Sequence, residues 1–271
     1  MSGYSIKSAG GIKYISFNIF SDTGFVRHAF TTRLGGVSQG PFRSLNLATH
    51  VGDHREAVLE NRAAVCAALG FGLDEMVAGQ QVHGKRVYVV TGEDRGRGAA
   101  DSETAIPETD ALITNVPGIL LSSYYADCVP VMLLDPVKKA VGLVHAGWKG
   151  TAMRIACAAL AAMSEAFGTD PIHCLAAIAP SIGDCCYEVD RPLVDAFNQY
   201  GFDPGPFLKQ TGENRWRLDL CGANRHILEE SGVRPGNIAV TGLCAACSPE
   251  LFFSYRRSGS CGRMASLMAL V

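Results

Sequence analysis

Two short apolar runs joined by a turn constrain the fold of this chain more than any other feature. Residues 129–134 and 140–144 are predicted to be buried strands, and Asp135-Pro136 between them favours a hairpin. Neither run alternates cleanly between apolar and polar residues, so we expect both faces of these strands to be covered. Further strands are predicted at residues 118–122, 172–179, 238–241 and 265–270.

Helical periodicity predicts four helices among these strands. They span residues 55–69, 151–167, about 192–200 and 220–230, and the first two end at Gly70 and Gly168. Hairpins mixed with helices indicate an α+β fold rather than a doubly wound parallel sheet. Because no repeat or linker interrupts the pattern, we expect residues 1–271 to form a single domain.

Composition excludes several classes of protein. Of the 271 residues, 48% are apolar and 18% are charged, and the net charge is −2, so neither nucleic acid nor a membrane surface is expected as a partner. No stretch approaches the ~20 apolar residues of a membrane span, and the N-terminal residues contain no apolar leader. We therefore expect a cytoplasmic protein, with an oligomeric state that the sequence leaves open.

One thiol and two imidazoles stand out as candidate metal ligands. Cys128 and His145 lie at the ends of the two hairpin strands, and His83 lies upstream beside Gly84. Two imidazoles and one thiolate would hold a metal with one position open, which distinguishes a catalytic zinc site from a structural one. Spacing alone is weak support, because these separations match no local motif such as CxxC or HExxH.

The remaining histidines show no comparable pattern. His28, His173 and His226 have no second ligand type nearby, and they are expected to be buried and hydrogen-bonded or to lie on the surface. His50 and His54 have the spacing of a helical metal pair, but Gly52-Asp53 between them breaks the helix that such a pair requires.

The ten cysteines do not predict a disulfide framework, because the chain is long and shows no export signal. Cys244 and Cys247 form a CxxC pair, and a structural zinc would require a second pair. The neighbouring Cys185 and Cys186 are poorly spaced for two ligands of one tetrahedron. We therefore expect these cysteines to be buried thiols near a strand end.

Gly35-Gly36 and Gly147-x-x-Gly150 lack the strand and helix context of a nucleotide fingerprint, so a Rossmann fold is not expected.

Several polar residues lack an obvious structural purpose and are candidates for binding a substrate. Arg33 is a candidate phosphate ligand because a guanidinium binds phosphate through two nitrogens. The expected substrate-binding residues are Arg33, Asn46, Gln81, Asp127 and Tyr187, and Arg256-Arg257 is a further polar pair without a clear role.

Seven segments together resemble one family, the polyphenol-oxidase/laccase-domain proteins, also described as bacterial peptidoglycan editing factors and purine nucleoside phosphorylases. The segments occur in the family's order between about residues 29 and 263, and they are FTTRLGGVSQGPFRSLNLATHVGD, NRAAVCAALG, QQVHG, TDALITNVPGILLSSYYADCVPVMLLDP, VGLVHAGWKGT, AAIAPSIGDCCYEV and LFFSYRRSGSCGR. This resemblance implies a single-domain αββα layered sandwich with mixed sheets and a site in a surface cleft. It also implies that His83, Cys128 and His145 are the catalytic metal triad.

The activities that the resemblance implies are zinc-dependent phosphorolysis of adenosine, inosine, guanosine and methylthioadenosine, and deamination of adenosine. The expected ligands are thus purine nucleosides, phosphate and Zn²⁺. One alternative is a copper-dependent polyphenol oxidase, with Met132 as an axial ligand of a blue-copper site. Another is a cysteine hydrolase that edits peptidoglycan precursors, with Cys128 as nucleophile and His83 or His145 as base. A metal-binding module without enzymatic activity would not explain an open coordination position.

Overall fold

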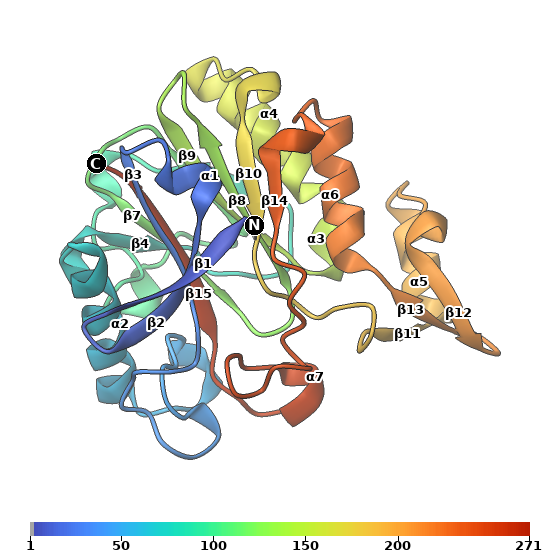
Figure 1. Cartoon of the computed structure of the whole chain (residues 1–271), viewed down its shortest axis with the longest axis horizontal. Helices are drawn as coiled ribbons and strands as arrows, with labels where there is room; N and C mark the ends of the chain where they lie inside the picture. The colour runs from blue at the N-terminus through green and yellow to red at the C-terminus, as the bar shows by residue number, and fades with distance from the viewer. Residues whose placement is uncertain (1–2) are drawn as a thin grey trace.

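Two six-stranded sheets packed face to face form the centre of the molecule, and helices cover their outer faces (Figure 1). The structure is a computed structural model and describes residues 3–271. Apolar side chains of both sheets fill the space between them, including Phe30 from one sheet and Leu134 from the other. The expected α+β class, with mixed sheets in αββα layers, is confirmed.

The first sheet is antiparallel except at one edge, where β4 pairs with β7 in parallel. Its β15 lies in the middle of the sheet, although it is the last strand of the chain. The strand order is β1 (Tyr4–Ala9), β2 (Ile12–Phe17), β3 (Val26–Thr31), β15 (Met264–Leu270), β7 (Leu120–Tyr125) and β4 (Met76–Ala78).

The second sheet contains the predicted hairpin at its centre. Its order is β14 (Ile238–Val240), β10 (Leu175–Ile178), β8 (Val129–Asp135), β9 (Ala140–Ala146), β6 (Ala111–Thr114) and β5 (Val87–Val89). Asp135 closes the hairpin by accepting hydrogen bonds from the backbone N–H groups of Val137 and Lys138. The register places Pro130 opposite His145, so Cys128 and His145 lie at the same end of the hairpin.

Helices pack on the outer face of each sheet. α2 (Arg55–Leu69) contributes Val65 to the core outside the first sheet, whereas α4 (Ile155–Phe167) and α6 (Leu220–Glu230) cover the second. The predicted bounds of α2 and α6 are confirmed. α2 ends where Gly70 takes a left-handed conformation at φ +84°, which glycine adopts without steric cost.

The helix predicted over residues 151–167 is wrong as one element. The chain forms α3 (Trp148–Ala152) and then α4, with Arg154 between them at φ +59°. A left-handed residue interrupts the α-helical hydrogen-bond ladder, and apolar periodicity cannot reveal one in a residue other than glycine. The strand predicted over 172–179 is likewise shorter, because Pro171–His173 forms a 3₁₀ turn before β10.

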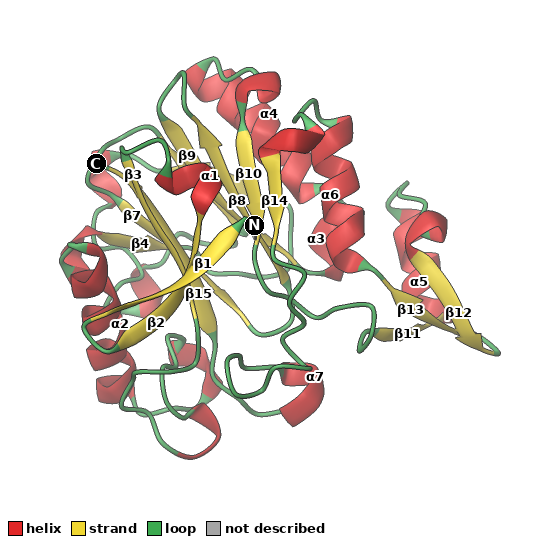
Figure 2. Cartoon of the chain, viewed as in Figure 1, coloured by secondary structure: helices red, strands yellow, loops and turns green. Residues whose placement is uncertain are grey.

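A third, small sheet projects beside the two main ones together with α5 (Arg191–Gln199), as Figure 2 shows. Its strands are β11 (Glu188–Asp190), β13 (Arg215–Leu218) and β12 (Leu208–Gly212), none of which the sequence analysis predicted. The remaining short helices are α1 (Asn18–Ser21) and α7 (Tyr255–Ser258). Across residues 3–271, none of the helices combines the length and the apolarity that crossing a membrane requires.

Candidate metal centre

His83, Cys128 and His145 converge at one end of the central hairpin. One ligand atom from each residue lies within 4.8 Å of the other two. The Cys128 Sγ is 3.7 Å from the His83 Nε2, and the two imidazole ring centres are 4.8 Å apart in an edge-to-face arrangement. His145 is buried, Cys128 is half-buried and His83 is exposed, so the group opens to solvent on the His83 side.

The carboxylate of Asp110 holds two of these three residues, His83 and His145, in position through hydrogen bonds. Its carboxylate accepts a hydrogen bond of 2.8 Å from the Nδ1 of His145, which leaves the Nε2 of that ring for a ligand. The same carboxylate accepts hydrogen bonds from the backbone N–H groups of Val82, His83 and Gly84. One buried carboxylate therefore fixes both the tautomer of His145 and the loop that presents His83.

The backbone at the site adopts conformations that are uncommon for its residues. His83 has φ +60° and Asp127, which precedes Cys128, has φ +89°. Such left-handed conformations cost free energy in residues other than glycine, and they persist only where surrounding contacts enforce them. The hydrogen bonds from the 82–84 backbone to Asp110 enforce the first, and a 2.6 Å hydrogen bond from the Arg256 N–H to the Asp127 carboxylate supports the second.

Gly147 allows the triad to close. A Cβ atom at this position would lie 2.8 Å from the Cδ2 of His83 and 3.1 Å from the Sγ of Cys128. Both distances are shorter than an ordinary van der Waals contact of about 3.5–4.0 Å. The absence of a side chain two positions after His145 therefore permits His83 and Cys128 to approach each other closely.

The charges of the three side chains are strongly coupled. Burial disfavours the Cys128 thiolate, but the neighbouring imidazoles, His145 above all, outweigh it and lower the pKa of Cys128 to about 6. Burial also disfavours the imidazolium of His145, yet the Cys128 thiolate and Asp110 raise its pKa to about 9. Both shifts favour a thiolate paired with an imidazolium when no metal is bound.

The triad lies in a cleft of about 450 Å³, a volume typical of a small-molecule site. Four of the lining side chains are the aromatic rings of tyrosine or tryptophan, and two are arginines. The lining residues are His50, Gln81, His83, Tyr124, Ala126, Asp127, Cys128, His145, Trp148, Ile182, Tyr187, Leu193, Tyr255, Arg256 and Arg263.

Three of the five expected substrate-binding residues, Gln81, Asp127 and Tyr187, line this cleft. The amide of Gln81, however, is engaged by the backbone of Tyr124, donating to its carbonyl at 2.9 Å and accepting from its N–H at 2.8 Å. Gln81 therefore braces the cleft wall. Asp127 keeps one buried carboxylate oxygen, Oδ1, without a hydrogen-bond partner among the described residues.

The structure places the other two residues, Arg33 and Asn46, outside the cleft lining. The guanidinium of Arg33 donates to the carbonyls of Arg43 and Pro249, so it braces loops rather than presenting a phosphate site. Asn46 is fully buried and exchanges hydrogen bonds with the Ala48 backbone and the Arg263 N–H. The sequence pattern could not reveal these partners because several of them are far away in the chain.

Four residues of the site were not predicted from the sequence in the roles that the structure gives them. Asp110 gave no signal, since an aspartate before a strand is ordinary in sequence. Arg256 was noted only as part of a polar pair, Arg263 was not singled out, and His50 was considered only as a metal ligand. Burial, followed by the nearby positive charges of Arg263 and Arg62, lowers the pKa of His50.

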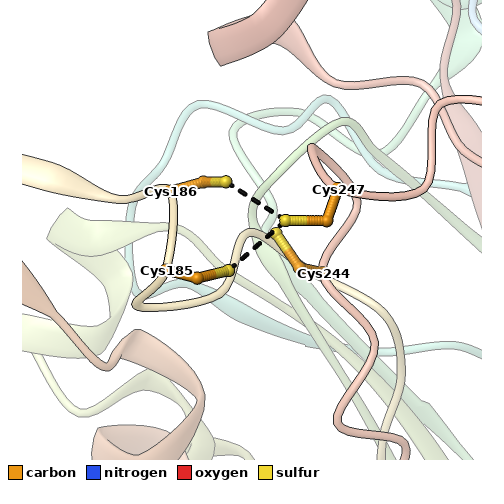
Figure 3. A group of neighbouring side chains, drawn as sticks. All are labelled: Cys185, Cys186, Cys244 and Cys247. Atoms are coloured by element: carbon orange, nitrogen blue, oxygen red, sulfur yellow. Dashed lines mark hydrogen bonds between the residues drawn. The ribbon is translucent and has the colours of Figure 1, made fainter.

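A second cluster contains four cysteines. Cys185, Cys186, Cys244 and Cys247 present sulfur atoms within 4.8 Å of one another (Figure 3). The prediction of buried thiols at a strand end is wrong for Cys185 and Cys247, which are exposed, because each lies in a turn, at residues 184–186 and 245–247. Vicinal spacing suggested that Cys185 and Cys186 could not face one point, but the chain turns at residues 184–186 and brings both toward Cys247.

Comparisons with known proteins show the family to which this chain belongs. Residues 27–271 match the family model described as multi-copper polyphenol oxidoreductase laccase. The purine nucleoside phosphorylase YlmD of Bacillus subtilis (strain 168) is 41% identical over 242 residues, covering 89% of this chain and 87% of that protein. The adenosine deaminase RL5, from an unknown prokaryotic organism, is 36% identical over 234 residues, covering 85% of this chain and 88% of that protein. The crystal structure of YlmD from Geobacillus stearothermophilus superposes with a TM-score of 0.93 at 38% identity, covering 100% of this chain and 99% of that chain.

Proposed function

Because the chain belongs to the multi-copper polyphenol oxidoreductase laccase family, we propose that it is a zinc-dependent purine nucleoside phosphorylase that also deaminates adenosine. The observation that supports this most directly is the convergence of His83, Cys128 and His145 in a cleft of nucleoside size, with Asp110 behind them. The relatives named purine nucleoside phosphorylase and adenosine deaminase supply the reaction classes. Adenosine, inosine, guanosine and methylthioadenosine are the proposed substrates.

The donor atoms fit zinc. The Nε2 of His83, the Sγ of Cys128 and the Nε2 of His145 would hold the ion, since Asp110 occupies the other nitrogen of His145. Two neutral imidazoles and one thiolate leave a net charge of about +1 on a Zn²⁺ site, with one coordination position open. A bound zinc ion would supply a Lewis acid that polarises an oxygen of phosphate or water.

The protein's own residues would bind and orient the reactants. Phosphorolysis forms a bond between a phosphate oxygen and C1′ of the ribose and breaks the bond between C1′ and the purine nitrogen, which leaves with a proton. Arg256 and Arg263 line the cleft and are the proposed phosphate ligands, through guanidinium N–H groups other than those of Nη1, which donates to backbone carbonyls in both residues. Tyr187 and Trp148 line the cleft and are the aromatic residues proposed to contact the purine. In deamination, a water oxygen adds to C6 of adenine and ammonia leaves.

Copper-dependent phenol oxidation is supported less well by this geometry. Met132, the candidate axial ligand, is fully buried between the two sheets and does not line the cleft. His28 accepts a hydrogen bond from the Phe17 N–H on the first sheet, away from the triad. Within residues 3–271, the triad and the four-cysteine cluster are the two groups of three or more potential metal ligands, so a trinuclear copper cluster has no ligand set there.

A cysteine hydrolase is the second candidate, because the Cys128 thiolate is paired with the imidazolium of His145. Such a pair is a nucleophile with its acid-base partner, as peptidoglycan editing would require. The two candidates differ in their need for metal. Activity that survives exhaustive chelation but not thiol alkylation would favour the hydrolase.

The decisive experiment measures phosphate-dependent release of hypoxanthine from inosine together with zinc content. We expect Cys128→Ala to lose both turnover and the zinc ion of the triad, whereas Cys157→Ser, a half-buried cysteine on α4, retains both. Unchanged phosphorolysis by Cys128→Ala would refute the proposal.

A further inference from the structure

We propose that Cys185, Cys186, Cys244 and Cys247 form a second metal site, which holds a structural zinc ion through four thiolates (Figure 3). The Sγ of Cys247 lies 3.5 Å from that of Cys185 and 3.4 Å from that of Cys186, and all four sulfurs lie within 4.8 Å of one another. A tetrahedral zinc ion with sulfur ligands at about 2.3 Å separates those sulfurs by about 3.8 Å. The cluster therefore already has the dimensions of a four-thiolate zinc site.

Two segments that are far apart in sequence build this cluster. Ser181 and Cys244 form an isolated parallel bridge, and the Ala245 N–H donates to the Ser181 carbonyl at 2.8 Å. The turn at residues 184–186 is closed by the Cys186 and Tyr187 N–H groups, which both donate to the Gly183 carbonyl. This turn is what allows two adjacent cysteines to direct their sulfurs to the same place.

Gly183 fits the cluster in two ways. Its N–H donates to the Cys244 Sγ at 3.2 Å, the kind of hydrogen bond that stabilises a thiolate ligand. A Cβ at this position would lie 3.2 Å from both the Cys185 Sγ and the Cys244 Cβ, so a larger residue would crowd the cluster. The chain thus both supports one thiolate and keeps the space beside it clear.

The position of the cluster indicates what the ion would do. The segment that contains Cys185 continues directly to Tyr187 in the cleft wall, and Ile182 lies just before it. The Ala246 carbonyl, within the other segment, accepts a 3.0 Å hydrogen bond from Arg257, the neighbour of the cleft residue Arg256. A zinc ion with four protein ligands would link the two segments that lead to these cleft residues. In contrast to the triad, such a site has no open coordination position for a substrate.

The main alternative is a redox pair, in which Cys247 forms a disulfide with Cys185 or Cys186. A disulfide requires a sulfur separation of about 2.05 Å and accounts for only two of the four thiols. It also leaves unexplained why Cys244, the most buried of the four, receives the Gly183 hydrogen bond. Four converging sulfurs are better explained by a metal.

The test begins with the zinc content of the whole protein, purified under reducing conditions without added metal. We expect about two zinc ions per chain in the wild-type protein. The variant His83→Ala/Cys128→Ala should retain about one, and X-ray absorption at the zinc edge should show it surrounded by four sulfurs at about 2.3 Å. That measurement leaves all four cysteines intact, so it does not depend on how well cluster variants fold.

The complementary variant is Cys244→Ser/Cys247→Ser, which should lose one zinc ion and melt at a lower temperature. The control Cys157→Ser/Cys221→Ser, which changes two half-buried cysteines outside both clusters, should keep two. If the proposed function also holds, the cluster variant should change KM for inosine more than kcat. Two results would overturn the second site and leave the triad untouched. One is that the wild-type protein holds a single zinc ion and that Cys244→Ser/Cys247→Ser still holds it. The other is a native disulfide at Cys247.

Discussion

Replacing Gly147 with alanine should open the triad without disturbing the backbone. Gly147 has φ −67° and ψ 175°, a conformation that alanine adopts freely, so the added methyl group acts only through its neighbours. Its Cβ would lie 2.8 Å from the Cδ2 of His83, and an ordinary contact of about 3.5 Å requires the ring to move by about 0.7 Å. Metal sites tolerate changes of only about 0.2 Å in ligand distance.

We therefore expect Gly147→Ala to weaken zinc binding at the triad by about tenfold to a hundredfold, the range seen when the surroundings of metal ligands are altered. That range corresponds to about 1.4–2.7 kcal/mol. The assay is the zinc dependence of inosine phosphorolysis in a metal-buffered solution. Gly236→Ala is the matched control, because no atom lies within 4 Å of the added Cβ. Wild-type zinc dependence in Gly147→Ala would refute the steric argument.

Three other changes test separate parts of the structure. Asp110→Asn removes the charge that orients His145, so zinc affinity in the same assay should fall by about tenfold or more, and an unchanged affinity would contradict the role of Asp110. Arg256→Ala should raise KM for phosphate by about tenfold or more through loss of a charged hydrogen bond, whereas Arg225→Ala, on the exposed face of α6, should not. Burial lowers the pKa of His28 from 6.5 to about 4, so the unfolded chain takes up a proton first as the pH falls. Unfolding titrations should therefore show that the wild type loses up to about 3 kcal/mol more stability than His28→Gln between pH 6.5 and 4, and parallel curves would exclude this effect.

The local sequence predicted those helices and strands whose start, end or turn depends only on residues within the same segment. The helix over residues 55–69 ends at a glycine, and the hairpin closes at an aspartate, so neither depends on distant contacts. The helix over 151–167 was predicted as one element because the left-handed conformation of Arg154 has no local signature. The strands of the small sheet were missed because their side chains are largely exposed and give no apolar run.

The sequence by itself determined the α+β class and the central hairpin, and it singled out His83, Cys128 and His145, whose side chains converge in the structure. The tertiary structure alone decided which other residues join them. Asp110 hydrogen-bonds to His145 on the neighbouring strand, and Arg33 donates to the carbonyl of Pro249, which is far away in the chain. The sulfur atoms of four cysteines come together from two separate turns. The physical reason is that hydrogen bonds, electrostatic interactions and metal ligation act over a few ångströms in space, whatever the separation of the residues in the chain.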